Sequence, residues 1–496
     1  MRKLNYSKIK LDYDFLYNLG CTARNKEKYN KSIKYFISCA EIAYYTNLKL
    51  HDDSLEKQLE YMSISILGKA SALPPEKGKI IFHDSFSLDN KGLTQQYIRA
   101  IANTDFKVLY IVENNTNRNH DILSEISNYS NITVHIIPKD LYGVDKIKYM
   151  KNLISDYNPE KALLHLTPWS VEAFICWYNF KETTKFLINL TDHAFWIGKK
   201  CSNYFIEFRS YGMKTSNLIR GIPINRLLDL PFYPITNEDK NPFEGFPFQF
   251  VKDSCVIFTG GSYYKMYGRN NAFLIILKEL IEKHRNLIIL IAGSGNSKPI
   301  ESFIKLYKLE NNIKLIGSRK DIAAVFKRID IYLNTYPLNG GLMSQLAVYY
   351  KKPLIGLADI NMKTCYTEEF FLHNANNIKL TYFDIKEFYE AISNLIKSPI
   401  LRDEVTSQYK NMLISPEDFK YKLINILKTK KITFSTSENK ESNQKTELFD
   451  LAIEIENKYL KNYELLILQR VKYSIFLDSP FFFLKKAIAY IFKKLF

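Results

Sequence analysis

One pair of neighbouring residues, Asp192 and His193, has the groups of an acid–base site. The pair follows an apolar run that ends at Leu190 and precedes Phe195-Trp196, an aromatic pair expected to be exposed and to stack on a ligand. An unperturbed imidazole titrates near neutral pH, so His193 can act as a general base toward a hydroxyl group. The alternatives are that His193 steadies a bound ligand or is a structural histidine.

A second set of residues could bind an anion. Four glycine turns each follow a predicted strand: Gly260-Gly261, Gly293-Ser294-Gly295, Gly317 and Gly340-Gly341. Glycine lets a ligand approach the backbone, and the N–H groups at a helix N-terminus attract phosphate. One such turn is an ordinary strand–helix connection, whereas four at one sheet edge predict a diphosphate site. Nearby side chains expected to take part are Lys265, Arg269, Ser318, Arg319, Tyr336, Asn339 and Ser344.

The first half of the chain offers further candidates, whose roles stay open. Asn90, Lys91 and Gly92 follow the first predicted strand and open a helix, either as a ligand loop or as an ordinary turn capped by Asn90. Three charged residues downstream of His193 are expected either to line the same site or to form a buried salt bridge: Glu207, Arg209 and Arg220.

Two runs of alternating strands and helices must position these residues. Apolar strands alternate with helices over residues 79–225 and again over residues 255–400. This alternation predicts two Rossmann-like, doubly wound parallel sheets of the α/β class, facing across a cleft. Ligands bind such folds outside the carboxyl ends of the strands.

Composition shifts suggest the domain boundaries. Residues 1–75 are expected to form a helical extension and residues 76–235 the first Rossmann-like domain. Residues 250–432 are expected to form the second, nucleotide-binding domain. The polar residues 433–447 are typical of a flexible linker, and residues 448–496 of a helical tail.

The tail ends in PFFFLKKAIAYIFKKLF, which has two faces when wound as a helix. One face is apolar and carries Leu484, Ile488, Ile491 and Leu495, flanked by Phe481 and Phe492. Lysines fall on the other side. This pattern over 481–496 predicts a helix lying in an anionic membrane surface. The alternative is a helix packed on the core of the protein itself.

Composition limits the partners. The net charge of +17 indicates an acidic partner, but no nucleic-acid-binding motif is present. The six cysteines form no C-x-x-C pair, and the only D-x-D motif, Asp12-Tyr13-Asp14, is expected on the surface of a helical segment, so no metal is expected. Without a signal peptide or a membrane-spanning run, a cytoplasmic location is expected, with peripheral binding at the inner face of the plasma membrane as the alternative.

The ordered motifs of residues 255–400 resemble the nucleotide-sugar-binding half of GT-B glycosyltransferases. The motifs are FTGG, LIILIAGSG, NIKLIGSRKD and IDIYLNTYP, followed by Gly340-Gly341. Asn-Thr-Tyr-Pro-Leu-Asn-Gly-Gly (334–341) is similar to a segment of the O-GlcNAc transferase group. Leu342, Met343 and Ser344 stand where that group has a histidine–threonine cluster. Gln345 and Ala347 stand in the neighbourhood of the paired glutamates of many retaining enzymes.

The resemblance implies a glycosyltransferase that moves a hexosyl or N-acetylhexosaminyl group from a nucleotide-sugar, expected to be UDP-linked, without cofactor or metal. It places Asn90, Lys91 and Gly92 in an acceptor-side loop. The expected acceptor is a saccharide, a lipid-linked saccharide or a protein, as in surface-polysaccharide synthesis. A nucleotide-sugar epimerase on the same fold and a non-catalytic membrane-linked scaffold are the alternatives.

Overall fold

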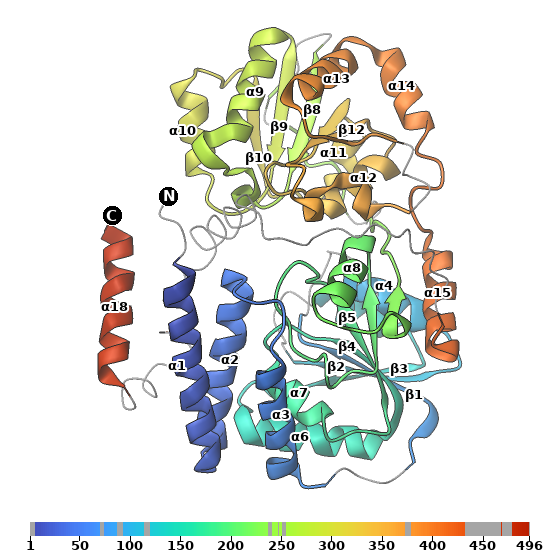
Figure 1. The fold of residues 1–496 in the computed structure, drawn as a ribbon. Coiled ribbons are helices and arrows are strands. Elements are labelled where there is room, and N and C mark those ends of the chain that lie inside the picture. Colours follow the sequence, from blue (N-terminus) through green and yellow to red (C-terminus); the bar gives the residue numbers. More distant parts are fainter. Residues whose placement is uncertain are drawn as a thin grey trace. The chain divides into compact units, whose positions relative to one another are not determined.

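The computed structural model of the chain folds into two compact units, each with one parallel sheet (Figure 1). One unit contains residues 2–230, 416–443 and 461–496, and the other is built mainly from residues 231–415. We call them the N-terminal and the C-terminal unit. The structure describes residues 5–69, 74–86, 93–113, 120–236, 241–246, 248–249, 254–372, 378–431, 468 and 479–495.

The sheet of the N-terminal unit has seven parallel strands in the order β3-β2-β1-β4-β5-β6-β7. Its strands are buried on both faces, which explains their continuous apolar runs. They are β1 (Glu76–Asp84), β2 (Lys107–Val112), β3 (Ile132–Ile136), β4 (Pro159–His165), β5 (Thr184–Asn189), β6 (Tyr204–Glu207) and β7 (Leu227–Asp229). The connecting helices are α4 (Leu93–Ile101), α5 (His120–Ile126), α6 (Gly143–Tyr157), α7 (Val171–Trp177) and α8 (Ser210–Leu218).

Three helices precede this sheet and pack on it: α1 (Tyr6–Asn25), α2 (Tyr29–Thr46) and α3 (Asp53–Leu67), shown in dark blue beside α6 and α7 in Figure 1. Their anchor is the buried carboxylate of Glu56. Its oxygens accept hydrogen bonds from the N–H groups of residues 198–200, at 2.6–2.9 Å, and from the Tyr178 hydroxyl at 3.0 Å. Burial raises the pKa of Glu56, while these donors oppose the rise.

Two late helices also belong to the N-terminal unit. Helix α15 (Pro416–Thr429) packs on α4, where the rings of Phe419 and Tyr97 are 5.3 Å apart. The sequence had assigned these residues to the second domain, but amphipathicity does not reveal which sheet a helix covers. Helix α18 (Pro480–Leu495), in red, packs on α1 (Figure 1). No helix in the described part of the chain is long and apolar enough to cross a bilayer.

The expected surface position of Asp12-Tyr13-Asp14 is wrong for the first two residues. Asp12 and Tyr13 are buried, and Asp12 pairs with Lys486 of α18. Only Asp14 faces outward, where it pairs with Lys10 at 2.5 Å. The partner of Asp12 is 474 residues away in the sequence, so helical periodicity could not reveal it.

The C-terminal unit has six parallel strands in the order β10-β9-β8-β11-β12-β13. They are β8 (Cys255–Gly260), β9 (Leu287–Ala292), β10 (Ile313–Gly317), β11 (Ile331–Leu333), β12 (Leu354–Leu357) and β13 (Thr381–Tyr382). The helices are α9 (Ala272–Lys283), α10 (Lys298–Leu306), α11 (Ile322–Phe326), α12 (Gly341–Tyr349), α13 (Ile385–Lys397) and α14 (Pro399–Ser407). The expected architecture of two doubly wound parallel sheets is confirmed.

Replacing Glu56 with alanine is expected to destabilise the protein by about 1–3 kcal/mol, because buried N–H groups lose their acceptor. Urea unfolding followed by circular dichroism measures the change. Lys57→Ala on the same helix is the control, since Lys57 is exposed. A Glu56→Ala protein as stable as the Lys57→Ala protein would remove Glu56 as the anchor.

Candidate functional site

The strand order of the C-terminal unit reverses between β8 and β11, which are neighbours in the sheet. Chain segments leave the carboxyl ends of two such strands in opposite directions, and the crevice between them is where ligands bind in this kind of sheet. Gly260 ends β8, and Asn334 follows β11 directly. The first and the last of the predicted glycine turns therefore lie at this reversal, and the turns after β9 and β10 lie farther along the same sheet edge.

Three of these turns contact one another through the backbone. The Gly261 N–H donates to the Ala292 carbonyl at 3.1 Å, and the Gly293 N–H donates to the Gly317 carbonyl at 2.9 Å. A Cβ atom at Gly293 would overlap the Gly261 carbonyl oxygen and approach the Tyr263 ring to 2.9 Å. Glycine is therefore required at Gly293 by close packing of the backbone.

The loop before α12 is shaped by the Asn334 side chain. Asn334 Oδ1 accepts hydrogen bonds from the N–H groups of Thr335 at 3.0 Å and Gly340 at 2.8 Å. Helix α12 then begins at Gly341, whose missing side chain leaves room for the Phe370 ring. The next N–H groups, of Leu342 and Met343, have no intrahelical acceptor because they lie in the first turn. They and the helix dipole make this end of α12 suitable for an anion.

Lys265 places a positive charge at the same loop. Its Nζ donates to the carbonyl of Asn339 at 3.0 Å, two residues before α12 begins. Tyr336 in this loop is partly buried, and burial raises the pKa of its hydroxyl. Lys265, Tyr336, Asn339 and Gly340 are thus brought together, as the sequence predicted for this group.

Other predicted donor-site residues have different surroundings. Arg319 donates to both Asp321 oxygens, at 2.7 and 2.6 Å, and to the Gly245 carbonyl at 2.8 Å, so its guanidinium holds the 243–246 segment in place. Ser344 is fully buried, and its hydroxyl donates to the Gly340 carbonyl at 3.0 Å. Contact of Arg319 and Ser344 with the ligand stays a prediction, and both side chains are engaged within the protein. Ser318 is exposed beside Gly317, and the side chain of Arg269 lies outside the described residues.

In the N-terminal unit, Asp192 and His193 follow β5 and form a close pair. His193 Nδ1 lies 3.2 Å from Asp192 Oδ1, and the imidazole is 40% exposed while Asp192 is buried. Arg209 donates two hydrogen bonds to the same carboxylate, at 2.5 and 2.9 Å. Burial alone would raise the pKa of Asp192, but the Arg209 guanidinium outweighs it and holds that pKa well below its usual range. Asp192 is therefore ionised behind an accessible imidazole.

A second buried carboxyl, Glu207, lies close to this pair. It accepts hydrogen bonds from Asn189, at 3.0 and 2.9 Å, and from the Ser216 hydroxyl at 2.5 Å. A Cβ atom at Gly212 would lie 2.5 Å from Glu207 and 3.3 Å from an Asp192 oxygen, so both carboxyls face one point. Burial, with a smaller contribution from Asp192, raises the pKa of Glu207 to about 7 against the hydrogen bonds.

The expected exposed aromatic pair is wrong, because Phe195 is 0% and Trp196 3% exposed. The guanidinium of the buried Arg220 lies 4.9 Å from the Trp196 ring and donates to the carbonyls of Asp192 and Ala194. These aromatic residues are part of the core under the Asp192–His193 turn. They cannot stack on a ligand in this conformation. The sequence left open whether three charged residues line the site or form buried ionic contacts. The structure agrees with the second alternative for Glu207, Arg209 and Arg220.

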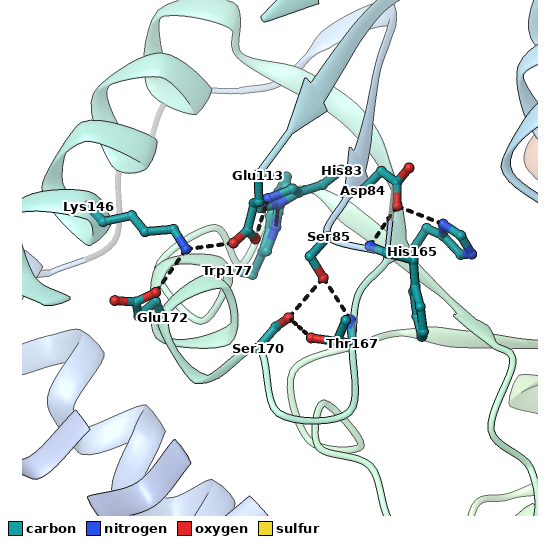
Figure 2. A network of polar contacts seen from close by, with 11 residues as sticks. His83, Asp84, Ser85, Glu113, Lys146, His165, Thr167, Ser170, Glu172 and Trp177 are labelled. Carbon is teal, nitrogen blue, oxygen red and sulfur yellow. Dashed lines mark hydrogen bonds and ion pairs between the residues drawn. The ribbon is translucent and has the colours of Figure 1, made fainter. Parts of the chain in front are cut away.

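The strand order of the N-terminal sheet reverses between β1 and β4, where the sequence had identified no side chain (Figure 2). Asp84 ends β1 and His165 ends β4, with Asp84 Oδ1 2.9 Å from His165 Nδ1. The Tyr110 hydroxyl donates to the other Asp84 oxygen at 2.8 Å. His165 Nε2 is buried without a hydrogen-bond partner among the described residues. The sequence does show an aspartate or a histidine at the end of each of these two strands. Only the strand order reveals that the two strand ends are neighbours.

Beside this pair, a chain of charged groups runs from β1 to α6 and α7 (Figure 2). Trp177 donates to His83 Nδ1 at 2.9 Å, and His83 Nε2 lies 2.9 Å from Glu113. Lys146 bridges Glu113 at 2.6 Å and Glu172 at 2.8 Å. Burial opposes ionisation of Glu113, but Lys146 and His83 outweigh it and lower its pKa to about 2. This network fixes the ends of β1 and β2.

The predicted loop of Asn90, Lys91 and Gly92 lies outside the described residues, a few positions after Phe86. Its role stays a prediction. No group of three or more His, Cys, Asp or Glu side chains able to hold a metal ion is found among the residues that the structure describes.

Replacing Glu207 with glutamine is expected to flatten the pH dependence of stability. The folded pKa of about 7 exceeds the usual 4.5, so the contribution of Glu207 is complete below its unfolded pKa and is lost as the pH rises through about 7. Between about pH 5.5 and about pH 8, the free energy of unfolding of the wild type should fall by about 2 kcal/mol more than that of Glu207→Gln. Urea unfolding at both pH values measures this, with Glu182→Gln as an exposed control. If the unfolding free energies of the wild type and Glu207→Gln fell equally over this pH range, the raised pKa of Glu207 would be contradicted.

Known proteins were compared with this chain. No protein-family model and no curated protein sequence matches it. A mutant O-GlcNAc transferase from Thermobaculum terrenum matches with a TM-score of 0.52 and 12% identity, over 84% of each chain. A glycosyltransferase from Rickettsia africae matches with a TM-score of 0.51 and 13% identity, over 72% of this chain and 99% of that one. HepE from Anabaena, solved with UDP, matches with a TM-score of 0.50 and 11% identity, over 70% and 99%.

At these identities the likeness concerns the fold. The T. terrenum match extends over most of both chains, and the other two span almost the whole of the proteins that they match. The resemblance inferred from the glycine turns of residues 255–400 is therefore confirmed at the level of architecture. The chain has the GT-B glycosyltransferase fold.

Proposed function

We propose that this protein is a glycosyltransferase that moves a sugar from a UDP-linked donor to a hydroxyl group of an acceptor. The observation that carries this proposal is the set of glycine turns along the carboxyl edge of the C-terminal sheet, of which two lie at the strand reversal and one of these precedes the first turn of α12. Such an edge suits a nucleoside diphosphate, because backbone N–H groups and a helix dipole both favour its negative charge.

In this proposal the donor diphosphate binds at the first turn of α12. The N–H groups of Leu342 and Met343 would donate to its oxygens, and Lys265 would offset the charge that develops on the leaving UDP. Lys265 is already positioned at the loop through Asn339. These backbone groups and this cation could neutralise the diphosphate without a metal ion. They also explain how the site can function although Leu342 and Met343 have no polar side chains.

The N-terminal unit carries the proposed general base. If His193 donates its Nδ1 proton to Asp192, its Nε2 has a free lone pair that can accept the proton of the acceptor hydroxyl. The acceptor oxygen then forms a bond to the anomeric carbon, the bond from that carbon to the diphosphate breaks, and UDP leaves with the electron pair. Arg209 keeps Asp192 ionised, and the Asp192 carboxylate favours the imidazolium formed in this step.

The acceptor belongs to the proposal only as a class. A saccharide, a lipid-linked saccharide and a protein all offer the required hydroxyl, and a hexosyl or N-acetylhexosaminyl group could be transferred. We place the reaction in the cytoplasm, in the synthesis of a surface polysaccharide. A nucleotide-sugar epimerase would instead convert the donor without an acceptor, and a scaffold would bind no nucleotide.

Isothermal titration of the full chain is expected to detect UDP binding that is tighter than GDP binding. Lys265→Met should weaken UDP binding about tenfold, since it removes one charge-assisted contact worth about 1.5 kcal/mol. Lys283→Met is the control, because Lys283 is exposed at the end of α9, which leads into the opposite edge of the sheet. No binding of either nucleotide would favour the scaffold, and an unchanged Lys265→Met affinity would remove Lys265 from the site.

His193→Ala is expected to lower kcat for sugar transfer by about 10²–10⁴ while leaving the UDP affinity unchanged, because the residue acts on the acceptor proton. Release of UDP from UDP-sugars with a panel of saccharide acceptors measures kcat. His135→Ala is the control, a partly exposed histidine on β3 of the same unit. Full activity of His193→Ala would dismiss the base, and conversion of the donor to an isomer without acceptor would favour the epimerase.

A further inference from the structure

Helix α18 packs on α1 with a charged side chain facing inward. Lys486 is 0% exposed and pairs with the buried carboxylate of Asp12. One turn earlier, Phe482 stacks on Phe15 of α1, with ring centroids 4.6 Å apart. The ion pair and the stacked rings fix which side of α18 faces the protein.

The opposite side of α18 is apolar and faces outward. We call it the apolar face, made of Phe481, Leu484, Ile488 and Ile491. Their spacing of three, four and three residues forms one stripe along the helix. Phe481 is 78% exposed, and the other three are 51–53% exposed.

An ordinary surface helix turns its apolar side to the core and its opposite, charged side to water. Helix α18 differs because large apolar side chains lie on both its inward and its outward side. Large apolar side chains gathered in one exposed stripe mark a contact with another apolar phase. Packing on the protein's own core, the alternative from the sequence, therefore accounts for the side with Phe482 and Lys486 but not for the apolar face.

Two occupants could cover the apolar face, a second copy of the chain or a lipid surface, and the charge of the helix favours one of them. Residues 480–496 contain four lysines and no acidic residue, and one of these lysines, Lys486, is paired with Asp12. Lys485 is exposed next to the apolar face. A second copy of the chain would bring two such basic helices together, at the cost of like-charge repulsion. Anionic lipid would instead attract the lysines and accept the apolar side chains between its acyl chains.

We propose that α18, held on α1 by Asp12 and Lys486, presents its apolar face to an anionic lipid bilayer and binds the protein to that surface. The contact lies within the N-terminal unit and uses none of the residues assigned to donor binding. It therefore stands or falls separately from the proposed sugar transfer. Binding should weaken as salt rises, because lysine–headgroup attraction is screened.

Flotation of the full chain with vesicles tests the binding. The protein is expected to float with phosphatidylcholine vesicles that contain phosphatidylglycerol, and not with phosphatidylcholine alone. Ile488→Glu should weaken flotation at least about tenfold, because it places a charge in the apolar face. Ile400→Glu is the matched control, since Ile400 is 72% exposed on α14 of the C-terminal unit. Circular dichroism checks that both variants are folded.

A pair of tryptophan variants tests the orientation. Leu484→Trp should shift its added emission to the blue when anionic vesicles are present, because position 484 enters the lipid. Phe482→Trp should not respond, because position 482 stays against α1. A shift at both positions would overturn the docked orientation.

Two further outcomes would overturn the proposal itself. One is equal flotation of Ile488→Glu and the wild type. The other is a wild type that does not bind vesicles but forms a dimer in light scattering, with Ile488→Glu dissociating that dimer.

Discussion

The close approach of backbone segments at the carboxyl edge of the C-terminal sheet is the constraint on which the proposed donor site depends. A Cβ atom at Gly293 would overlap the Gly261 carbonyl, and one at Gly341 would overlap the Phe370 ring. Glycine at these positions therefore lets the ends of β8 and β9 contact each other and lets the start of α12 contact the segment that carries Phe370. The free N–H groups of α12 then point away from a rigid edge, which is what preorganised binding of a diphosphate requires.

The N-terminal unit depends instead on buried charges that neighbouring groups satisfy. Arg209 keeps Asp192 ionised, whereas Glu207, which no cation contacts directly, has a pKa of about 7. The two adjacent carboxyls thus have different pKa values, and the paired arginine lowers that of Asp192. Asp192 therefore stays ionised behind His193, whereas Glu207 changes its protonation near pH 7. The same principle holds α18 in place, since Lys486 pairs with the buried carboxylate of Asp12 inside the helical extension.

Much of the fold follows from sequence periodicity, but pairing between distant segments does not. Apolar runs predicted both parallel sheets, and the helical extension expected over residues 1–75 contains α1, α2 and α3. Gly340 and Lys265 were placed together because glycine turns after parallel strands must share an edge. Asp84 and His165 escaped notice, since 81 residues separate them and only the strand order makes them neighbours. Periodicity also did not reveal that Asp321 and the Gly245 carbonyl hold the guanidinium of Arg319, because Gly245 is 74 residues away in the sequence.

A crystal structure of the full chain with UDP tests the central claim most directly. The account predicts that the diphosphate lies within hydrogen-bond distance of the Leu342 and Met343 N–H groups, with Lys265 Nζ beside it. It also predicts that Arg319 stays on Asp321 and Ser344 on Gly340. UDP bound elsewhere, for example beside Asp84 and His165, with the first turn of α12 free of phosphate, would contradict the account.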